Sequence, residues 1–122
     1  MSRVVLRPAT RADFDAMLAE PLPYRVRAIA GEVDGELLAI GGLAFQLDGT
    51  VTAFLQASEI ARDYPVSLHR AALEILSEAR RLRIPCVMAE AEAGVEPAQR
   101  WLTRLGFSPA HIDGQEVWVW RR

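Results

Sequence analysis

One stretch constrains the fold of this chain more than any other: residues 50–83, in which an apolar strand leads into a single long amphipathic helix that closes just before Pro85. The strand alternates with the period of two that is typical of a half-buried strand. One of its faces carries Val51, Ala53, Leu55 and Ala57, and the other carries Thr52, Phe54 and Gln56. The apolar residues of the helix recur at helical spacing and form one stripe: Leu68, Ala72, Ile75, Leu76, Ala79 and Leu82. We expect the rest of the chain to pack around this unit.

The connection between the strand and the helix, EIARDYPVSLHR, is a candidate anion site. A helix N-terminus presents backbone N–H groups without helical partners, together with the positive end of the helix dipole. A strand that runs straight into a helix places these groups at the edge of the sheet, where an anion can reach them. We therefore expect the function of the chain to depend on this turn.

The composition predicts one globular domain that spans residues 1–122. Hydrophobic residues make up 51% and mean hydropathy is +0.08, yet no apolar run approaches the roughly 20 residues of a membrane span. The N-terminal sequence MSRVVLRPAT lacks the apolar segment of a signal peptide, so we expect a cytoplasmic protein. A net charge of −2 argues against a nucleic-acid binder that works by neutralising phosphates, so we do not expect nucleic acid as a partner.

Residue usage excludes several kinds of chemistry. Cys86 is the single cysteine, so neither an internal disulfide nor a multi-thiolate metal site is possible, and we expect no metal centre. The apolar residues around Cys86 predict a buried, inert thiol. All fourteen basic residues are arginine, which excludes a lysine nucleophile.

The first part of the chain predicts a strand, a helix and three antiparallel strands. Thr10 is positioned as the N-cap of the helix, which follows a strand that begins at residue 4. Strands are expected over residues 25–33 and 36–47, joined by a two-residue turn at Asp34-Gly35. Asp48-Gly49 repeats this turn before the strand at residue 51. Gly41-Gly42 predicts a bulge or a close approach of another backbone.

The last part of the chain predicts a parallel strand, a helix and a final hairpin. Residues 85–91 form a short apolar run that reads as a buried strand, parallel to the strand at residue 51. Pro97 lies in the first turn of the next helix, and Gly106 stands where a left-handed residue ends it. Asp113-Gly114 then predicts a turn into the strand QEVWVW. Trp118 and Trp120 share one face of that strand, which raises the hypothesis of a homodimer contact.

This order of elements resembles the GNAT superfamily of acyl-CoA N-acyltransferases over essentially the whole chain. The segments RPATRADFDAM and LTRLGF look like the first strand and helix of that family and its last helix and turn. The resemblance implies an α/β fold with a mixed, mostly antiparallel sheet of about seven strands flanked by about three helices. It also implies acetyl-CoA, or another acyl-CoA, as cofactor, with the pantetheine in a gap beside the fourth strand and the pyrophosphate on the following helix.

The chain departs from the family in its pyrophosphate loop. That loop is normally Gln or Arg, two residues, Gly, one residue, then Gly or Ala, but no glycine occurs here between Gly49 and Gly94. One alignment places the motif on Arg62, Pro65 and Ser67, and another places it on Tyr64, Ser67 and His69. By resemblance, the cofactor-binding residues are Arg62, Ser67, His69 and Arg70, with the backbone of Ala57 and Ser58 as oxyanion donor.

Acyl transfer to an amine also needs a base and an acid toward the leaving thiolate. Glu59 and Glu90 are the predicted catalytic residues, because each lies at the end of a strand beside the gap; the alternative is that they are solvated carboxylates. Glu92 lies at the same strand end as Glu90. The family often has an Asn near the start of its last helix and a Tyr further along it. The matching residues here are Val95 and Leu102.

These features lead to an expected function and its alternatives. The first is an acyl-CoA-dependent N-acyltransferase in which a small-molecule or peptide amine attacks the thioester directly. The second is a non-catalytic protein of the same fold with a structural or interaction role, such as a virion protein of phage or prophage origin. The third is a CoA-binding regulatory domain. Neither nucleic acid nor a membrane is an expected partner.

Overall fold

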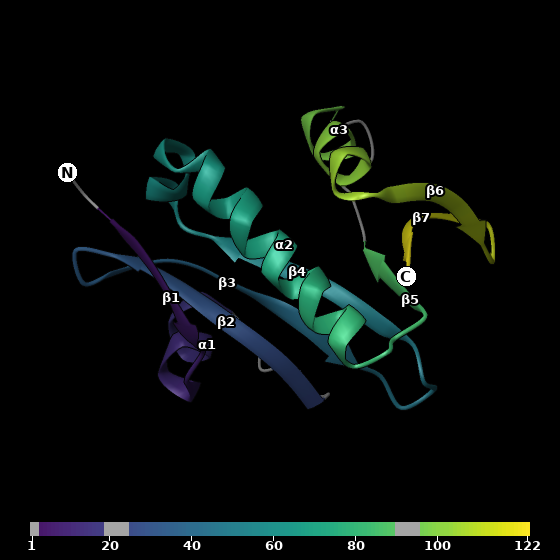
Figure 1. Cartoon of the computed structure of the whole chain (residues 1–122), viewed down its shortest axis with the longest axis horizontal. Coiled ribbons are helices and arrows are strands. Elements are labelled where there is room, and N and C mark those ends of the chain that lie inside the picture. Colours follow the sequence, from purple (N-terminus) through teal and green to yellow (C-terminus); the bar gives the residue numbers. More distant parts are fainter. Residues whose placement is uncertain (1–2, 19–24, 90–95) are drawn as a thin grey trace.

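A single seven-stranded sheet in the order β1-β2-β3-β4-β5-β7-β6 organises the chain (Figure 1). The computed structural model describes residues 3–18, 25–89 and 96–122. Its strands are β1 (Val4–Pro8), β2 (Arg25–Val33), β3 (Glu36–Phe45), β4 (Val51–Ala57), β5 (Cys86–Ala89), β6 (Phe107–Ile112) and β7 (Gln115–Arg121). Its helices are α1 (Arg11–Met17), α2 (Pro65–Arg81), α3 (Glu96–Leu105) and a 3₁₀ helix, η1 (Glu59–Asp63). β4 and β5 are parallel and the other pairs antiparallel, which confirms the expected mixed sheet.

Two of the three predicted two-residue Asp-Gly turns are present in the structure. Asp34-Gly35 and Asp113-Gly114 both have positive φ, as a type I′ turn requires. The prediction of a third such turn at Asp48-Gly49 is wrong: only the glycine has positive φ, and the Gln46 N–H donates to the Thr50 carbonyl at 2.9 Å, which closes a three-residue loop. The Asp48 carboxylate accepts the Thr50 backbone N–H at 2.9 Å, and this bond favours the longer loop.

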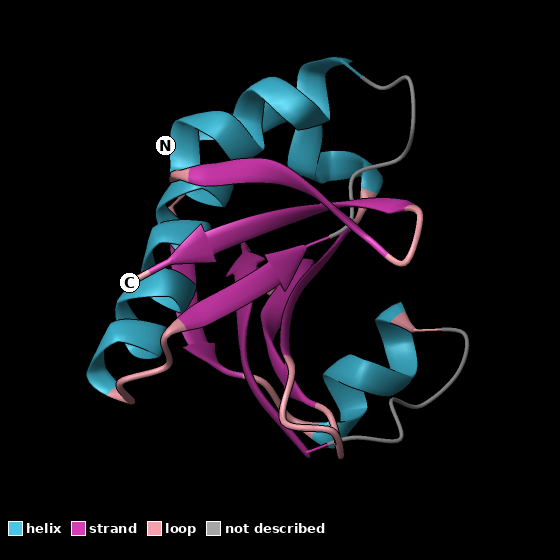
Figure 2. Ribbon diagram, turned by 90° about the vertical axis from the view of Figure 1, so that its right-hand side faces the viewer, coloured by secondary structure: helices cyan, strands magenta, loops and turns pink. Residues whose placement is uncertain are grey.

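The two sides of the sheet carry different helices. In Figure 2 the sheet separates α1 from α2. Thr10 caps α1 as predicted, in a capping box with Asp13, and the Arg7 guanidinium holds the pKa of Asp13 well below its usual range. Phe14 of α1 contacts Phe54 of β4, with ring centroids 6.4 Å apart, so α1 packs on the face of β4 opposite to α2.

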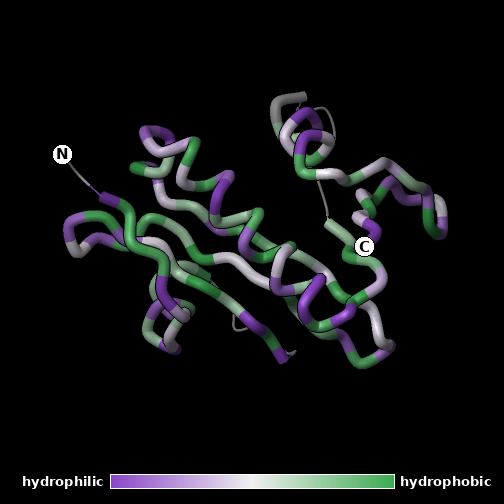
Figure 3. Tube along the Cα trace, viewed as in Figure 1, coloured by the Kyte–Doolittle hydropathy of each residue, from purple (hydrophilic) through white to green (hydrophobic). Residues whose placement is uncertain are grey.

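The main core lies between the sheet and the helices α2 and α3. Along α2, hydrophobic and hydrophilic residues alternate as expected for a helix with one buried face (Figure 3). Trp118 and Trp120 belong to this core, at 6% and 3% exposed, with the Arg80 guanidinium 5.5 Å from the Trp120 ring. Cys86 is half-buried, not buried as predicted, because it points away from this core. No helix within the described ranges is long and apolar enough to cross a membrane.

The glycine pair in β3 marks a close approach and not a bulge. A Cβ atom at Gly42 would lie 2.0 Å from the Arg27 carbonyl oxygen of β2. A Cβ atom at Gly41 would lie 3.0 Å from the Leu55 side chain and 3.1 Å from that of Ile75, so this glycine lets α2 approach the sheet. The register shift of β2 and β3 lies elsewhere, at Gly31, where Leu38 is the extra residue.

We predict that Gly42→Ala destabilises the protein by about 3 kcal/mol or more, because the new methyl group meets a backbone carbonyl that cannot move without breaking the pairing of β2 and β3. Gly31→Ala is the matched control. Its Cβ atom would be 3.4 Å from the Leu6 side chain, an ordinary contact, and should change stability by less than about 1 kcal/mol. Urea denaturation measures both, and equal losses would contradict the prediction.

Candidate functional site

The sheet opens between β4 and β5. Within the described residues these strands pair at one position only, Thr52 with Met88. By contrast, β4 pairs with β3 along its whole length, from Val51 to Ala57. Beyond Thr52, the edge of β4 that faces β5 therefore has backbone N–H and C=O groups that β5 does not bond.

A cleft of about 420 Å³ occupies this opening, with α2 on one side and α3 on the other (Figure 1). Its size falls within the roughly 300–1,000 Å³ of small-molecule sites. The lining consists of residues 52–55 of β4, Ala72, Ile75 and Leu76 of α2, Ala89 of β5, Ala98, Trp101, Leu102 and Leu105 of α3, and Phe107 of β6. Because most of these side chains are apolar, the cleft suits a ligand with a long apolar portion.

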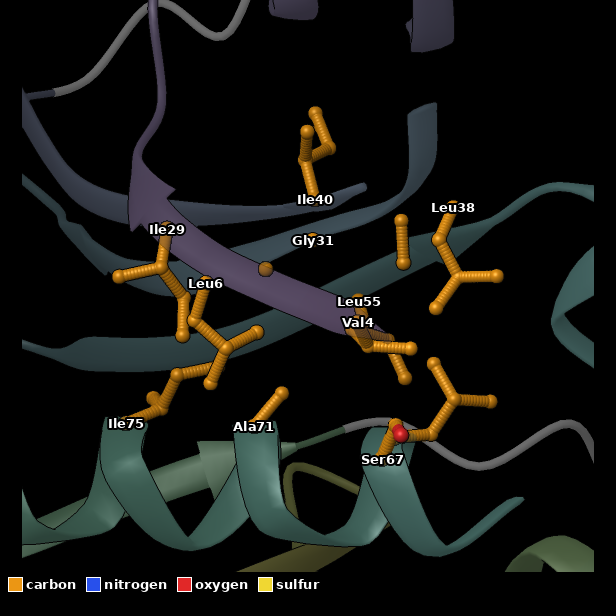
Figure 4. A pocket seen from close by; sticks show the side chains of 13 residues that line it. Val4, Leu6, Ile29, Gly31, Leu38, Ile40, Leu55, Ser67, Ala71 and Ile75 are labelled. Atoms are coloured by element: carbon orange, nitrogen blue, oxygen red, sulfur yellow. The ribbon is translucent and has the colours of Figure 1, made fainter. Parts of the chain in front are cut away.

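Two other spaces border α2. The first is a crease of about 10 Å³ in which Ser67, Ala71 and Ile75 face the strands (Figure 4), and it has no room for a ligand. The second is a groove of about 340 Å³ beside the C-terminal half of α2. Glu78 borders this groove and pairs with Arg27 at 2.8 Å, and the Arg81 and Arg27 guanidinium groups hold the pKa of Glu78 below its usual value.

The start of α2 leaves backbone N–H groups without helical partners. Tyr64 is the N-cap residue but makes no side-chain hydrogen bond there, and Pro65 occupies the first helical position. The first bond of the ladder runs from the Leu68 N–H to the Tyr64 carbonyl at 3.1 Å. Pro65 has no N–H, so those of Val66 and Ser67 remain outside the ladder. Together with the helix dipole, they give this end of α2 a positive potential.

Three of the predicted cofactor-binding side chains lie at or near this helix start. Arg62, in η1, and Arg70, in α2, are exposed. Ser67 turns its side chain toward the sheet and lines the small crease (Figure 4). Its backbone N–H is therefore the group that it presents at the helix start, while the two arginines add positive charge.

His69, the fourth of these side chains, is bonded to Trp101 and so links α2 to α3 beside the cleft. The indole Nε1–H of Trp101 donates to Nδ1 of His69 at 3.1 Å. An indole nitrogen can only donate, so Nδ1 accepts and the neutral imidazole carries its proton on Nε2. The sequence offers no signal for this bond, because the two residues are 32 positions apart.

The backbone expected to bind an oxyanion is in part engaged. Ala57 is the last residue of β4 and is exposed. The backbone N–H and the hydroxyl of Ser58 both donate to the Leu38 carbonyl, each at 2.9 Å. These bonds fasten the end of β4 to β3, so the Ser58 N–H already has a partner.

The predicted acidic residues are placed only in part. Glu59 is the first residue of η1, and its side chain is exposed and is not among those that line the cleft. Glu90 and Glu92 lie outside the described residues. Leu102, at the position of the family's Tyr, is 9% exposed and lines the cleft. No cluster of His, Cys, Asp or Glu that could hold a metal ion occurs in the part of the chain that the structure describes.

Comparison with known proteins shows likeness at the level of structure. The chain matches no protein-family model and no curated protein sequence. It is similar to the ribosomal-protein-S18-alanine N-acetyltransferase of Escherichia coli, with 19% identity and a TM-score of 0.72 over 98% of this chain and 94% of that one. It is also similar to an N-acetyltransferase of Staphylococcus aureus Mu50, with 12% identity and a TM-score of 0.74 over 98% of each chain.

A third similar structure contains the nucleotide cofactor. It is an acetyltransferase of Bacillus subtilis in complex with CoA, with 12% identity and a TM-score of 0.70 over 100% of this chain and 99% of that one. At these identities the likeness concerns the fold. The alignments span nearly the whole of each chain.

We predict that His69 and Trp101 stabilise each other by about 1 kcal/mol through their hydrogen bond. The test is a double-mutant cycle of Trp101→Phe, His69→Leu and the double variant, measured by urea denaturation. Trp101→Phe keeps an aromatic ring and removes only the donor, so it separates the hydrogen bond from the packing. Strictly additive losses would contradict the bond.

Proposed function

This chain has the fold of the GNAT superfamily of acyl-CoA N-acyltransferases, and we propose that it transfers an acyl group from acyl-CoA to an amine. One observation carries the proposal: the apolar cleft that opens where β4 and β5 part is bordered by α2 from Ala72 onward, and the uncapped start of the same helix lies about two turns before Ala72. A long, largely apolar chain that ends in a pyrophosphate can use both features at once. The amine acceptor is a small molecule or a peptide.

The residues present fit the parts of CoA. Beyond Thr52, the edge of β4 that the described part of β5 does not pair would offer backbone groups to the amides of pantetheine, and the cleft lining would offer apolar surface to its carbon chain. The N–H groups of Val66 and Ser67 would bind the pyrophosphate, with Arg62 and Arg70 as neighbouring positive charges. When bound, the thioester supplies an acyl carbon that is open to attack and a thiolate leaving group.

The acceptor amine enters as the nucleophile. Its nitrogen forms a bond to the acyl carbon, the carbon–sulfur bond breaks, the nitrogen loses one proton and the thiolate gains one. Glu59 would take the proton from the nitrogen through water, since its side chain is exposed at the end of β4. Leu102 cannot protonate the thiolate, so that proton comes from solvent.

A non-catalytic CoA-binding or structural role is the second candidate. It is favoured by Leu102 in place of an acid, and by the Ser58 N–H that is bonded to Leu38 and not to a ligand. The two candidates differ in turnover but not in fold.

We predict that acetyl-CoA at about a hundredfold excess over its Kd stabilises the protein by about 2.7 kcal/mol, a rise in Tm of roughly 10 °C. Arg70→Ala should weaken CoA binding severalfold, because it removes positive charge near the helix start. Arg11→Ala is the matched control, an exposed arginine of α1 on the other side of the sheet. No shift at millimolar acetyl-CoA would exclude every CoA-binding function.

We predict that Glu59→Gln lowers kcat about a hundredfold, the scale of general-base catalysis, and leaves the KM for acyl-CoA unchanged. Release of free thiol with a panel of amines measures the rate. Asp63→Asn, an exposed acid at the other end of η1, is the control and should keep the wild-type kcat. An unchanged rate in Glu59→Gln would remove Glu59 from the reaction, and absence of turnover with any amine would favour the non-catalytic candidate.

A further inference from the structure

The floor of the cleft between β4 and β5 is part of the main hydrophobic core. Several lining residues are at most 9% exposed and belong to the core cluster: Ile75, Leu76, Ala89, Leu102, Leu105 and Phe107. An apolar group that reaches this floor would extend the packing of the core. Every CH₂ group buried there would strengthen binding about fourfold.

The walls of the cleft are built with small side chains. Ala53, Ala72, Ala89 and Ala98 line it from β4, α2, β5 and α3 respectively. Ala53, Ala72 and Ala98 are only half-buried, whereas Ala79, which faces the core from α2, is 0% exposed. Protein interiors are close-packed. If the cleft had to hold only a two-carbon acyl group, larger side chains at these alanine positions could fill the remaining space. The alanines keep the cleft wide on every side.

The polar side chains of the lining already have partners. The Thr52 hydroxyl accepts a hydrogen bond from the Gln46 amide at 2.9 Å, and the Trp101 indole donates to His69. Among the described lining residues none is charged. An alkyl chain buried against these described residues needs no polar partner, so this part of the lining suits it.

We propose that the acyl donor of this protein carries an alkyl chain of several carbons, and that the cleft prefers it to an acetyl group. The inference rests on the proposed function and concerns the same cleft: pantetheine would follow the edge of β4, and the alkyl chain of the acyl group would occupy the floor of the cleft. The small side chains of Ala53, Ala72 and Ala98 set the length of the alkyl chain that the cleft accepts.

A series of CoA thioesters tests the proposal by isothermal titration calorimetry on the full chain. Free CoA and the acetyl, butanoyl, hexanoyl and octanoyl thioesters are compared. We expect Kd to fall about sixteenfold with each added pair of CH₂ groups until the cleft is filled. Equal Kd values along the series would overturn the preference and leave the proposed function intact. If neither CoA nor any thioester binds, both fail together.

Substitutions in the walls test where the chain lies. Ala72→Leu and Ala98→Leu should each lower, at least tenfold, the ratio of the acetyl-CoA Kd to the octanoyl-CoA Kd. The larger leucine side chain would occupy the space that the alkyl group needs. Ala16→Leu, at an exposed position of α1, is the matched control and should keep the wild-type ratio. An unchanged ratio in both wall variants would overturn the proposal. If either variant fails to fold, the wild-type series decides.

Discussion

The pairing of β4 with β5 at a single position, within the described residues, is the constraint on which the rest of the structure depends. The crossover through α2 brings β5 back beside β4 in parallel, but the described strands pair only at Thr52 and Met88. Each strand is held by its other neighbour, since β4 is paired with β3 over its length and β5 with β7. Each half of the sheet is therefore held together by its own pairing while the opening between β4 and β5 stays unclosed. The opening thus results from the way the strands pair, and α2 and α3 line the cleft that it leaves.

Much of the fold could be predicted because it depends on local chemistry. Thr10 caps its helix, Asp34-Gly35 forms its turn and Gly106 ends α3 at φ 102°, and each outcome is determined within a few residues. The errors have two sources. The bulge at Leu38 depends on how β2 and β3 register with each other, which a run of residues does not specify. The longer loop at Asp48-Gly49 is local, since the Asp48 carboxylate accepts the Thr50 N–H, but a two-residue Asp-Gly pattern does not distinguish the two loop lengths.

In the candidate site, too, the features that depend on local sequence could be predicted, and those that depend on distant partners could not. The uncapped start of α2 could be predicted, because a strand that leads into a helix start has the same unpaired N–H groups in any fold. The bond between His69 and Trp101, and that between Ser58 and Leu38, join residues brought together only by the sheet and the packed helices. The wall alanines are the hardest to recognise. In a sequence Ala72 counts as one more position of an apolar stripe, and only its place opposite β4 and α3 makes it a boundary of the cleft.

The missing loop glycines and the wide cleft have one common explanation. Between residues 50 and 82 no residue has positive φ, so η1 leads the chain into α2 without needing the conformational freedom of glycine. The start of α2 lacks an N–H group at Pro65, and in the proposed function this would weaken its hold on a pyrophosphate relative to a glycine loop. In the proposed preference for a longer acyl donor, burial of an alkyl chain against the core would offset that loss. The binding free energy would then lie less at the phosphate end of the ligand and more at its acyl end, and the acyl chain would be the part of the donor that the protein selects.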